Sequence, residues 1–139
     1  MKDDIRLVGW NVVVIDEATV GVFGGLDDRG MATRRVALLS VRDEHVMLPP
    51  ATLHDRTAFG SATLAADGAT VLVAGGAASD GGEVRDVLER WSLTGAASRY
   101  GQLSGPRRDH AAIRVDAGTM HGVLLVGGSD GTSALSSLE

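Results

Sequence analysis

Three short stretches decide the fold, and each ends in a glycine pair: Val20-Gly21-Val22-Phe23-Gly24-Gly25, Val71-Leu72-Val73-Ala74-Gly75-Gly76 and Val123-Leu124-Leu125-Val126-Gly127-Gly128. The first glycine of the pair stands at position 24, 75 or 127, so the stretches recur with periods of 51 and 52 residues. A constant period of about 50 residues indicates one supersecondary unit repeated in tandem. The repeat therefore takes precedence over any local motif in predicting the architecture.

Each glycine pair ends the second strand of a predicted four-stranded unit. The first strands are expected at 11–15, 60–65 and 110–115, and the later strands at 36–41, 45–48, 87–93, 98–103 and 134–139. The apolar runs are short, partly β-branched and bounded by Gly, Asp or Pro, which favours strands over helices. Glycine has no Cβ, so it allows close backbone approach and a positive φ where the second strand ends. Tandem antiparallel sheets of this kind are typical of β-propeller blades.

The repeat resembles the kelch family. Pro106-Arg107-Arg108-Asp109-His110-Ala111-Ala112 is similar to the opening of the kelch pattern, and Gly127-Gly128 and Glu139 follow it in the order of that pattern. The middle repeat has Gly75-Gly76, Glu89, Trp91 and Tyr100 in the same order and Ser61 in place of the opening His. The resemblance covers about residues 9–139. It implies an all-β chain of about 2.5–3 four-stranded antiparallel blades in an incomplete ring. Residues 1–139 would form a single partial propeller domain, with blades at about 9–53, 54–104 and 105–139, the last of them truncated. The residues that carry the repeat are Gly24, Gly25, Gly75, Gly76, Gly127, Gly128, Glu89, Trp91, Tyr100, Arg107 and His110.

The resemblance also implies structural roles for some of these side chains. Arg107 is expected to form a buried or half-buried ion pair with Glu89 or Glu139, because both residue types recur at fixed places in the family pattern. Trp91 and Tyr100 are expected to pack in the core or between blades. His110 is expected to join the hydrogen-bond network of the repeat.

The chain holds too few blades for a ring, because propellers close with about 4 to 8. Open ends would expose unpaired strand edges and apolar blade faces. Three interpretations stay open: a fragment whose further blades lie in a longer chain, several copies that self-associate to complete a ring, or the product of a partial reading frame.

Composition excludes several classes of function. The 139 residues carry a net charge of −5 and scattered arginines, which disfavours a nucleic-acid surface. Cysteine is absent, and no apolar stretch suits a signal peptide or a membrane span. The four histidines have no metal-ligand spacing, so we predict no metal, no cofactor and no catalytic residue. The compartment is left unassigned, and the Ala-, Gly- and Arg-rich composition suggests a bacterial protein.

Function is expected in the loops on one face of the propeller, because loops carry binding residues on a rigid scaffold. The leading prediction is a non-catalytic module that binds a protein, or a glycan. The alternatives are a fragment of a carbohydrate-active propeller enzyme, similar to galactose oxidase or a mutarotase, and a structural blade set of a bacterial surface protein. The predicted binding residues are Asp28, Arg29, Asp55, Arg56, Ser79, Asp80, Arg108, Asp109, Ser129 and Asp130.

Overall fold

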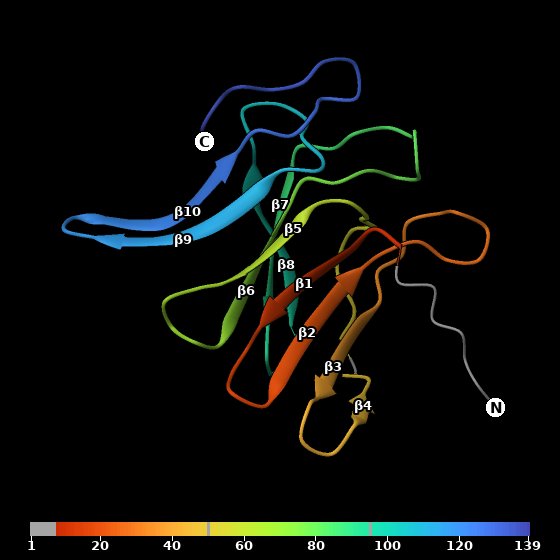
Figure 1. The fold of residues 1–139 in the computed structure, drawn as a ribbon, viewed down its shortest axis with the longest axis vertical. Helices are drawn as coiled ribbons and strands as arrows, with labels where there is room; N and C mark the ends of the chain where they lie inside the picture. Colours follow the sequence, from red (N-terminus) through yellow and green to blue (C-terminus); the bar gives the residue numbers. More distant parts are fainter. Residues whose placement is uncertain (1–7, 50, 95) are drawn as a thin grey trace.

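The protein is all-β, with two four-stranded antiparallel sheets and a two-stranded hairpin (Figure 1). The computed structural model describes residues 8–49, 51–94 and 96–139, and these ranges contain ten strands and no helix. Within them, no helix is therefore long and apolar enough to cross a membrane. Pro50 belongs to the predicted first unit and Gly95 to the second, and both lie outside the described residues.

The strands follow one another in meander order. The first sheet contains β1 (Trp10–Val14), β2 (Thr19–Gly24), β3 (Val36–Ser40) and β4 (His45–Met47). The second sheet contains β5 (Ser61–Leu64), β6 (Thr70–Ala74), β7 (Val87–Ser92) and β8 (Ala97–Gln102). The hairpin consists of β9 (Ala111–Ala117) and β10 (Met120–Val126). The second sheet lies between the other two, because β5 packs against β1 on one side and against β9 on the other.

Strand register repeats from one unit to the next. Val22 lies opposite Val12 in the first sheet, Val73 opposite Ala62 in the second, and Leu125 opposite Ala112 in the hairpin. Side chains alternate between the faces of a strand, so equivalent positions face the same way in every unit. In the second sheet, Val71 and Val73 face the first sheet, while Leu72 and Ala74 face the hairpin.

The main core lies between the two four-stranded sheets. Its fully buried side chains include Trp91 and Phe23, whose rings meet edge to face with centroids 5.3 Å apart. Val36, Leu53 and Val71 belong to the same buried cluster as these two rings. Burying side chains of this size contributes about 1.5–3 kcal/mol each. A second, smaller core lies between the second sheet and the hairpin, around Ala74, Leu103 and Leu125.

The glycine pairs hold consecutive units together through the main chain. The N–H of Gly25 donates to the carbonyl of Thr57 at 2.9 Å, and 51 residues later the N–H of Gly76 donates to the carbonyl of Arg107 at 2.8 Å. A Cβ on Gly75 would lie 2.2 Å from that Arg107 oxygen, and one on Gly24 would lie 2.1 Å from the oxygen of Thr57. These contacts confirm close backbone approach as the reason for the first two pairs.

A second repeated joint was not predicted. Gly9, Phe59 and Asp109 stand 50 residues apart, one or two residues before the first strand of each unit, and their φ angles are positive, at 69°, 61° and 53°. The N–H of Phe59 donates to the carbonyl of Gly9, and the N–H of Asp109 donates to that of Phe59, each at 2.7 Å. A bulky residue such as Phe is rarely found in this region of backbone conformation. The surrounding main-chain bonds therefore hold Phe59 in place.

The sequence analysis was wrong on two points. The predicted strand at 134–139 is present only as isolated bridges, Ser129 with Ala134 and Val126 with Leu138, because the pairing with β10 covers only its last residues. Tyr100, expected in a packed interior, is 61% exposed. Its side chain lies on β8 beyond the reach of the hairpin, which has too few strands to cover it.

No closed ring forms among the described residues, and both outer faces are apolar. Val12 and Val14 are exposed on the outer face of the first sheet, and Ile113 and Val126 on the outer face of the hairpin. In the second sheet the residues equivalent to Val12 and Val14 are Ala62 and Leu64, which pack into the main core. The outer face of the first sheet therefore has the same apolar pattern as a face that is buried in the second sheet.

Candidate binding surface

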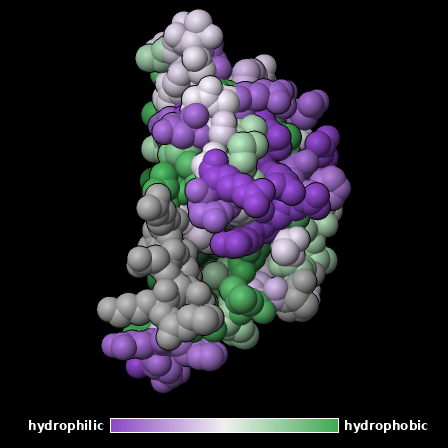
Figure 2. All heavy atoms as spheres, turned by 90° about the vertical axis from the view of Figure 1, so that its right-hand side faces the viewer, coloured by the Kyte–Doolittle hydropathy of each residue, from purple (hydrophilic) through white to green (hydrophobic). Residues whose placement is uncertain are grey.

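The connections after each second strand come together on one side of the molecule. Main-chain bridges join Met31 to Ser79, Thr33 to Thr57, and Arg108 to Ser129. Figure 2 shows the side from which the connections 25–35 and 75–86 project, and hydrophilic side chains predominate across its middle. We call this side the loop face.

Arg108 is the centre of the best-built polar cluster on the loop face. Its Nε lies 2.7 Å from Asp109 Oδ2, and its Nη2 lies 3.5 Å from Asp80 Oδ1. The guanidinium also stacks 4.3 Å above the centre of the Phe59 ring. The Arg108 side chain is only 13% exposed. Main-chain hydrogen bonds of 2.9 Å in both directions with Ser129 fix its backbone.

The chemistry of this cluster suits recognition of a polar surface. Arg108 is held by a carboxylate on either side and by an aromatic face, so its planar fork is already oriented. The carboxylates of Asp80 and Asp109 remain largely accessible. They can accept hydrogen bonds from a partner, and charge-assisted bonds of this kind are the stronger ones. Arginine and aromatic groups are also enriched where proteins meet.

A second polar cluster surrounds Asp55. Arg99 on β8 donates to both carboxylate oxygens of Asp55, at 2.9 and 3.1 Å, and this contact lowers the pKa of Asp55 below its ordinary value. The pair lines an open groove of about 470 Å³ together with Glu83, Arg85 and Asp86. The groove is therefore lined by charges of both signs.

Two glutamates hold the connections that lead into the second and third units. The buried Glu89 carboxylate accepts hydrogen bonds from the backbone N–H groups of His54 and Asp55. Fifty residues later, Glu139 accepts from the N–H and the hydroxyl of Ser104. Burial is the main cause of the raised pKa of Glu89. The backbone of Asp55, a predicted binding residue, is thus fixed by a residue of the repeat.

Arg107 forms the predicted ion pair, and its partner is Glu139. The Arg107 side chain is buried and its Nη2 lies 3.7 Å from Glu139 Oε2. Its guanidinium also donates to the carbonyl of Gly127 at 2.6 Å and to the hydroxyl of Ser137 at 2.8 Å. Arg107 therefore ties the connection before the hairpin to the segment after it.

His110 joins the second sheet to the hairpin. Its Nε2 lies 2.8 Å from the hydroxyl of Ser61, the first residue of β5. Burial, followed by the charge of Arg107, lowers the pKa of His110 to about 4. The imidazole is therefore neutral at pH 7, and its role is a hydrogen bond between two units.

The other predicted binding residues do not join these clusters. Asp28 and Arg29 lie exposed on the connection after β2, and Arg56 contributes only its carbonyl, which accepts from Arg85 at 3.0 Å. The carboxylate of Asp130 accepts from the backbone of Thr132 and Ser133, so it caps its own turn. Ser79 contributes its backbone to the bridge with Met31.

Sequence reasoning missed Phe59 and Arg99. The signal for Phe59 was its spacing of 50 residues from Asp109, which a search restricted to glycine pairs overlooks. Arg99 carries no repeat signal, because only the fold brings it to Asp55. Among the described residues, no group of three or more His, Cys, Asp or Glu side chains is placed to hold a metal ion. Compared with models of protein families and with curated proteins, the chain matches none.

Proposed function

We propose that this chain is a segment of a kelch-type β-propeller that binds a protein partner through the loop face. The kelch assignment is supported by residues 106–112 and by the glycine pairs in register. Further support is the recurrence of the same joints: the main-chain bonds of Gly25 and Gly76, and the glutamates that hold each connection. Each sheet is then one blade.

The Arg108 cluster carries the binding proposal. Phe59 and Asp80 come from the second unit, whereas Arg108 and Asp109 come from the connection into the third. Side chains distant in sequence thus converge on one exposed spot, which is how a rigid scaffold presents loop residues. A partner with donor groups facing Asp80 and Asp109 would complete the cluster.

Charge reversal on opposite sides of the molecule tests this function. Asp28→Lys with Asp80→Lys changes the loop face. The matched control, Glu17→Lys with Asp43→Lys, makes the same change of charge in the β1–β2 and β3–β4 turns, at the end of the first sheet away from the loop face. A partner is first isolated on the wild-type chain, and its affinity for all three proteins is then measured by calorimetry. Loss of binding in the loop-face variant alone supports the proposal.

Equal binding by all three proteins would place the partner elsewhere and refute the proposal. A glycan array run with the same proteins separates the two ligand classes. Binding to a defined glycan that the loop-face variant loses, without any protein partner, would replace the protein by a carbohydrate.

We further propose that the two apolar outer faces pack against more blades, from a longer polypeptide or from other copies. Light scattering after size exclusion distinguishes the two sources, since a sharp species near three chain masses means a ring of copies. Val14→Glu and Ile113→Lys then each block one end, and their mixture should form a dimer through the two unblocked ends. A folded monomer that these substitutions leave unchanged would exclude assembly from copies.

A further inference from the structure

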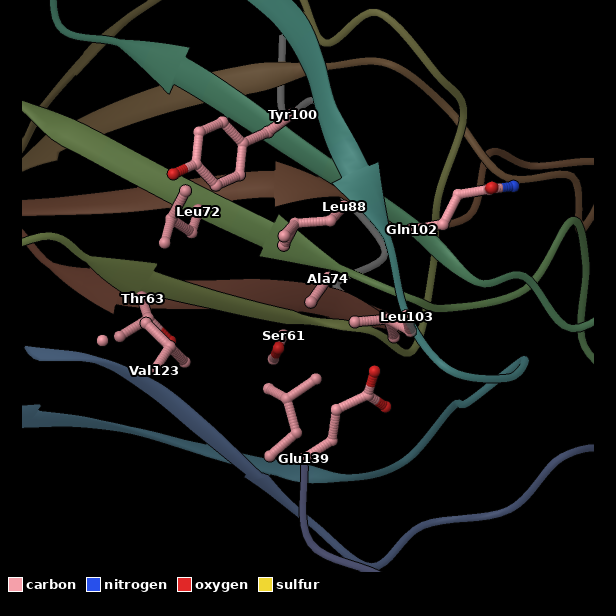
Figure 3. A pocket seen from close by; sticks show the side chains of 12 residues that line it. Ser61, Thr63, Leu72, Ala74, Leu88, Tyr100, Gln102, Leu103, Val123 and Glu139 are labelled. Atoms are coloured by element: carbon pink, nitrogen blue, oxygen red, sulfur yellow. The ribbon is translucent and has the colours of Figure 1, made fainter. Parts of the chain in front are cut away.

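Two cavities of different character lie on opposite faces of the second sheet. The larger, of about 270 Å³, is mostly apolar and opens between this sheet and the hairpin (Figure 3). The smaller, of about 10 Å³, lies on the face toward the first sheet and has room for about one water molecule. We call it the Glu89 cavity, and its lining residues are Asp55, Arg56, Thr57, Val73, Gly75, Arg85, Val87 and Glu89.

In this cavity, Thr57 stands where the third unit has Arg107. The carbonyl of Thr57 accepts a main-chain hydrogen bond from Gly25, and the carbonyl of Arg107 accepts the same bond from Gly76 one repeat later. The two residues are therefore equivalent, although their side chains differ in length and in charge.

The two side chains share one acceptor, but only the longer one reaches a carboxylate. The Thr57 hydroxyl donates to the carbonyl of Gly75 at 2.9 Å. The Arg107 guanidinium donates to the equivalent carbonyl, that of Gly127, at 2.6 Å, and its Nη2 also lies 3.7 Å from Glu139 Oε2. Threonine is too short for the second contact. The Glu89 cavity therefore lies at the position that corresponds to the guanidinium of the third unit.

Glu89 and Glu139 are equivalent, but only Glu139 has a cationic partner. Glu89 lies opposite Val73 in the second sheet, and Glu139 exchanges main-chain hydrogen bonds with the equivalent residue, Leu125. Glu89 is only 2% exposed, and among the described residues no cationic side chain forms an ion pair with it. Burial of a carboxylate is costly unless a positive charge compensates it.

Arg85 lines the Glu89 cavity but does not take the role of Arg107. Its Nη1 donates to the carbonyl of Arg56 at 3.0 Å, and it forms no ion pair with Glu89. The hydrogen bonds that the Glu89 carboxylate accepts come from backbone N–H groups, which are neutral. The charge of Glu89 is therefore hydrogen-bonded but not compensated by a side chain of its own unit.

We propose that the Glu89 cavity binds one monovalent cation of about the size of a water molecule, ammonium or potassium, beside the Glu89 carboxylate, the Gly75 carbonyl and the Thr57 hydroxyl. Oxygen atoms are the ligands that hard cations take in proteins. One carboxylate compensates one positive charge, which favours a monovalent ion over a divalent one. The loop face takes no part in this site, so the proposal does not depend on the proposed function.

The test measures the stability of the full chain in different chloride salts. Urea midpoints are compared in mixtures of tetramethylammonium chloride with potassium or ammonium chloride, at a total ionic strength of about 0.5 M so that screening is equal. Tetramethylammonium is too large for the cavity, so the mixtures vary only the cation that can bind. Above the Kd of that cation, each tenfold increase in its concentration should raise the midpoint by about 0.7 M, for a slope of about 2 kcal/mol per molar urea.

Three substitutions locate this effect. Glu89→Gln removes the charge and keeps the shape, so it should abolish the difference between salts. Glu139→Gln is the matched control in the third unit and should keep the difference, because Arg107 faces that carboxylate. Thr57→Arg supplies the guanidinium itself, so its midpoint should not depend on the cation and should exceed that of the wild-type chain in tetramethylammonium chloride.

Rubidium, which substitutes for potassium, gives a direct observation of the ion. Crystals grown in rubidium chloride should show an anomalous difference peak beside the Glu89 carboxylate in the wild-type chain and none there in Glu89→Gln. Equal midpoints of the wild-type chain in all the salts would overturn the proposal and leave the cavity to a water molecule. A dependence on the cation that persists in Glu89→Gln would place the ion elsewhere and overturn it as well.

Discussion

The sharpest test of the repeated joint compares two glycines that share a backbone conformation and differ in their surroundings. Gly75 has φ +61° and Gly81 has φ +74°, so an alanine at either site adopts a conformation that costs about 1–2 kcal/mol. A Cβ on Gly81 would meet nothing within 4 Å, whereas a Cβ on Gly75 would lie 2.2 Å from the Arg107 carbonyl oxygen. The difference between the two variants isolates the contact between units.

That contact cannot be relieved by rotating a side chain, because the opposing atom belongs to the backbone. Relief requires the connection at Arg107 to move by about 1 Å, which stretches the 2.8 Å bond from the N–H of Gly76. A lost bond costs about 0.5–1.5 kcal/mol, and overpacking costs about 1–3 kcal/mol. We therefore expect Gly75→Ala to reduce the free energy of unfolding by about 2–4 kcal/mol more than Gly81→Ala does.

Urea denaturation followed by circular dichroism measures this difference. With a slope of about 2 kcal/mol per molar urea, the midpoint of Gly75→Ala should lie about 1–2 M below that of Gly81→Ala. Equal midpoints would mean that the connection yields without cost. The reasoning that the glycine pair exists for close approach would then be refuted, although its positive φ would still explain it in part.

Two further predictions concern buried titratable groups. Glu89→Ala leaves the N–H groups of His54 and Asp55 without their acceptor, so it should cost about 2–4 kcal/mol by the same assay, while the exposed control Glu83→Ala changes little. His110, with a folded pKa of about 4 against 6.5 unfolded, contributes stability that is complete above pH 6.5 and is lost as the pH falls toward 4. The free energy of unfolding lost in this way should reach about 3 kcal/mol. His110→Gln should flatten the dependence of that free energy on pH in this range. An unchanged slope would contradict the prediction. Glu89 acts in the opposite sense, because its raised pKa favours the folded state as it gains a proton.

The strand layout could be predicted because the repeat fixes it three times over. One apolar run ending in glycine is ambiguous, but runs at 20–25, 71–76 and 123–128 in register define the second strand of every unit. The repeat also predicted the positions of the Glu and the Trp on the third strand, since Glu89 and Trp91 are buried where the repeat places them. Each of these positions is fixed by a neighbour that recurs with the same period.

Residues whose environment does not recur could not be predicted in this way. Tyr100 has the sequence context of a packed aromatic residue, yet the covering strands are absent from the described hairpin, so its ring lies at an open groove. Arg99 pairs with Asp55, which lies 44 residues away in the sequence, and the repeat does not predict this contact because it does not recur with the period. Phe59, like its counterparts Gly9 and Asp109, has a left-handed backbone conformation. Because three different residue types occupy this equivalent position, the sequence alone does not reveal the pattern.

The proposed binding residues and the repeat residues are nevertheless not independent, because they alternate along the same connection. From 107 to 110 the side chains point inward, outward, outward and inward: Arg107 and His110 are buried, while Arg108 and Asp109 reach the loop face. The inner pair fixes the backbone through Gly127 and Ser61, and this places the outer pair against Asp80. A substitution at Arg107 should therefore weaken the proposed binding at the loop face, although the Arg107 side chain itself is buried. Sequence reasoning can find such outer residues only through the inner ones that position them.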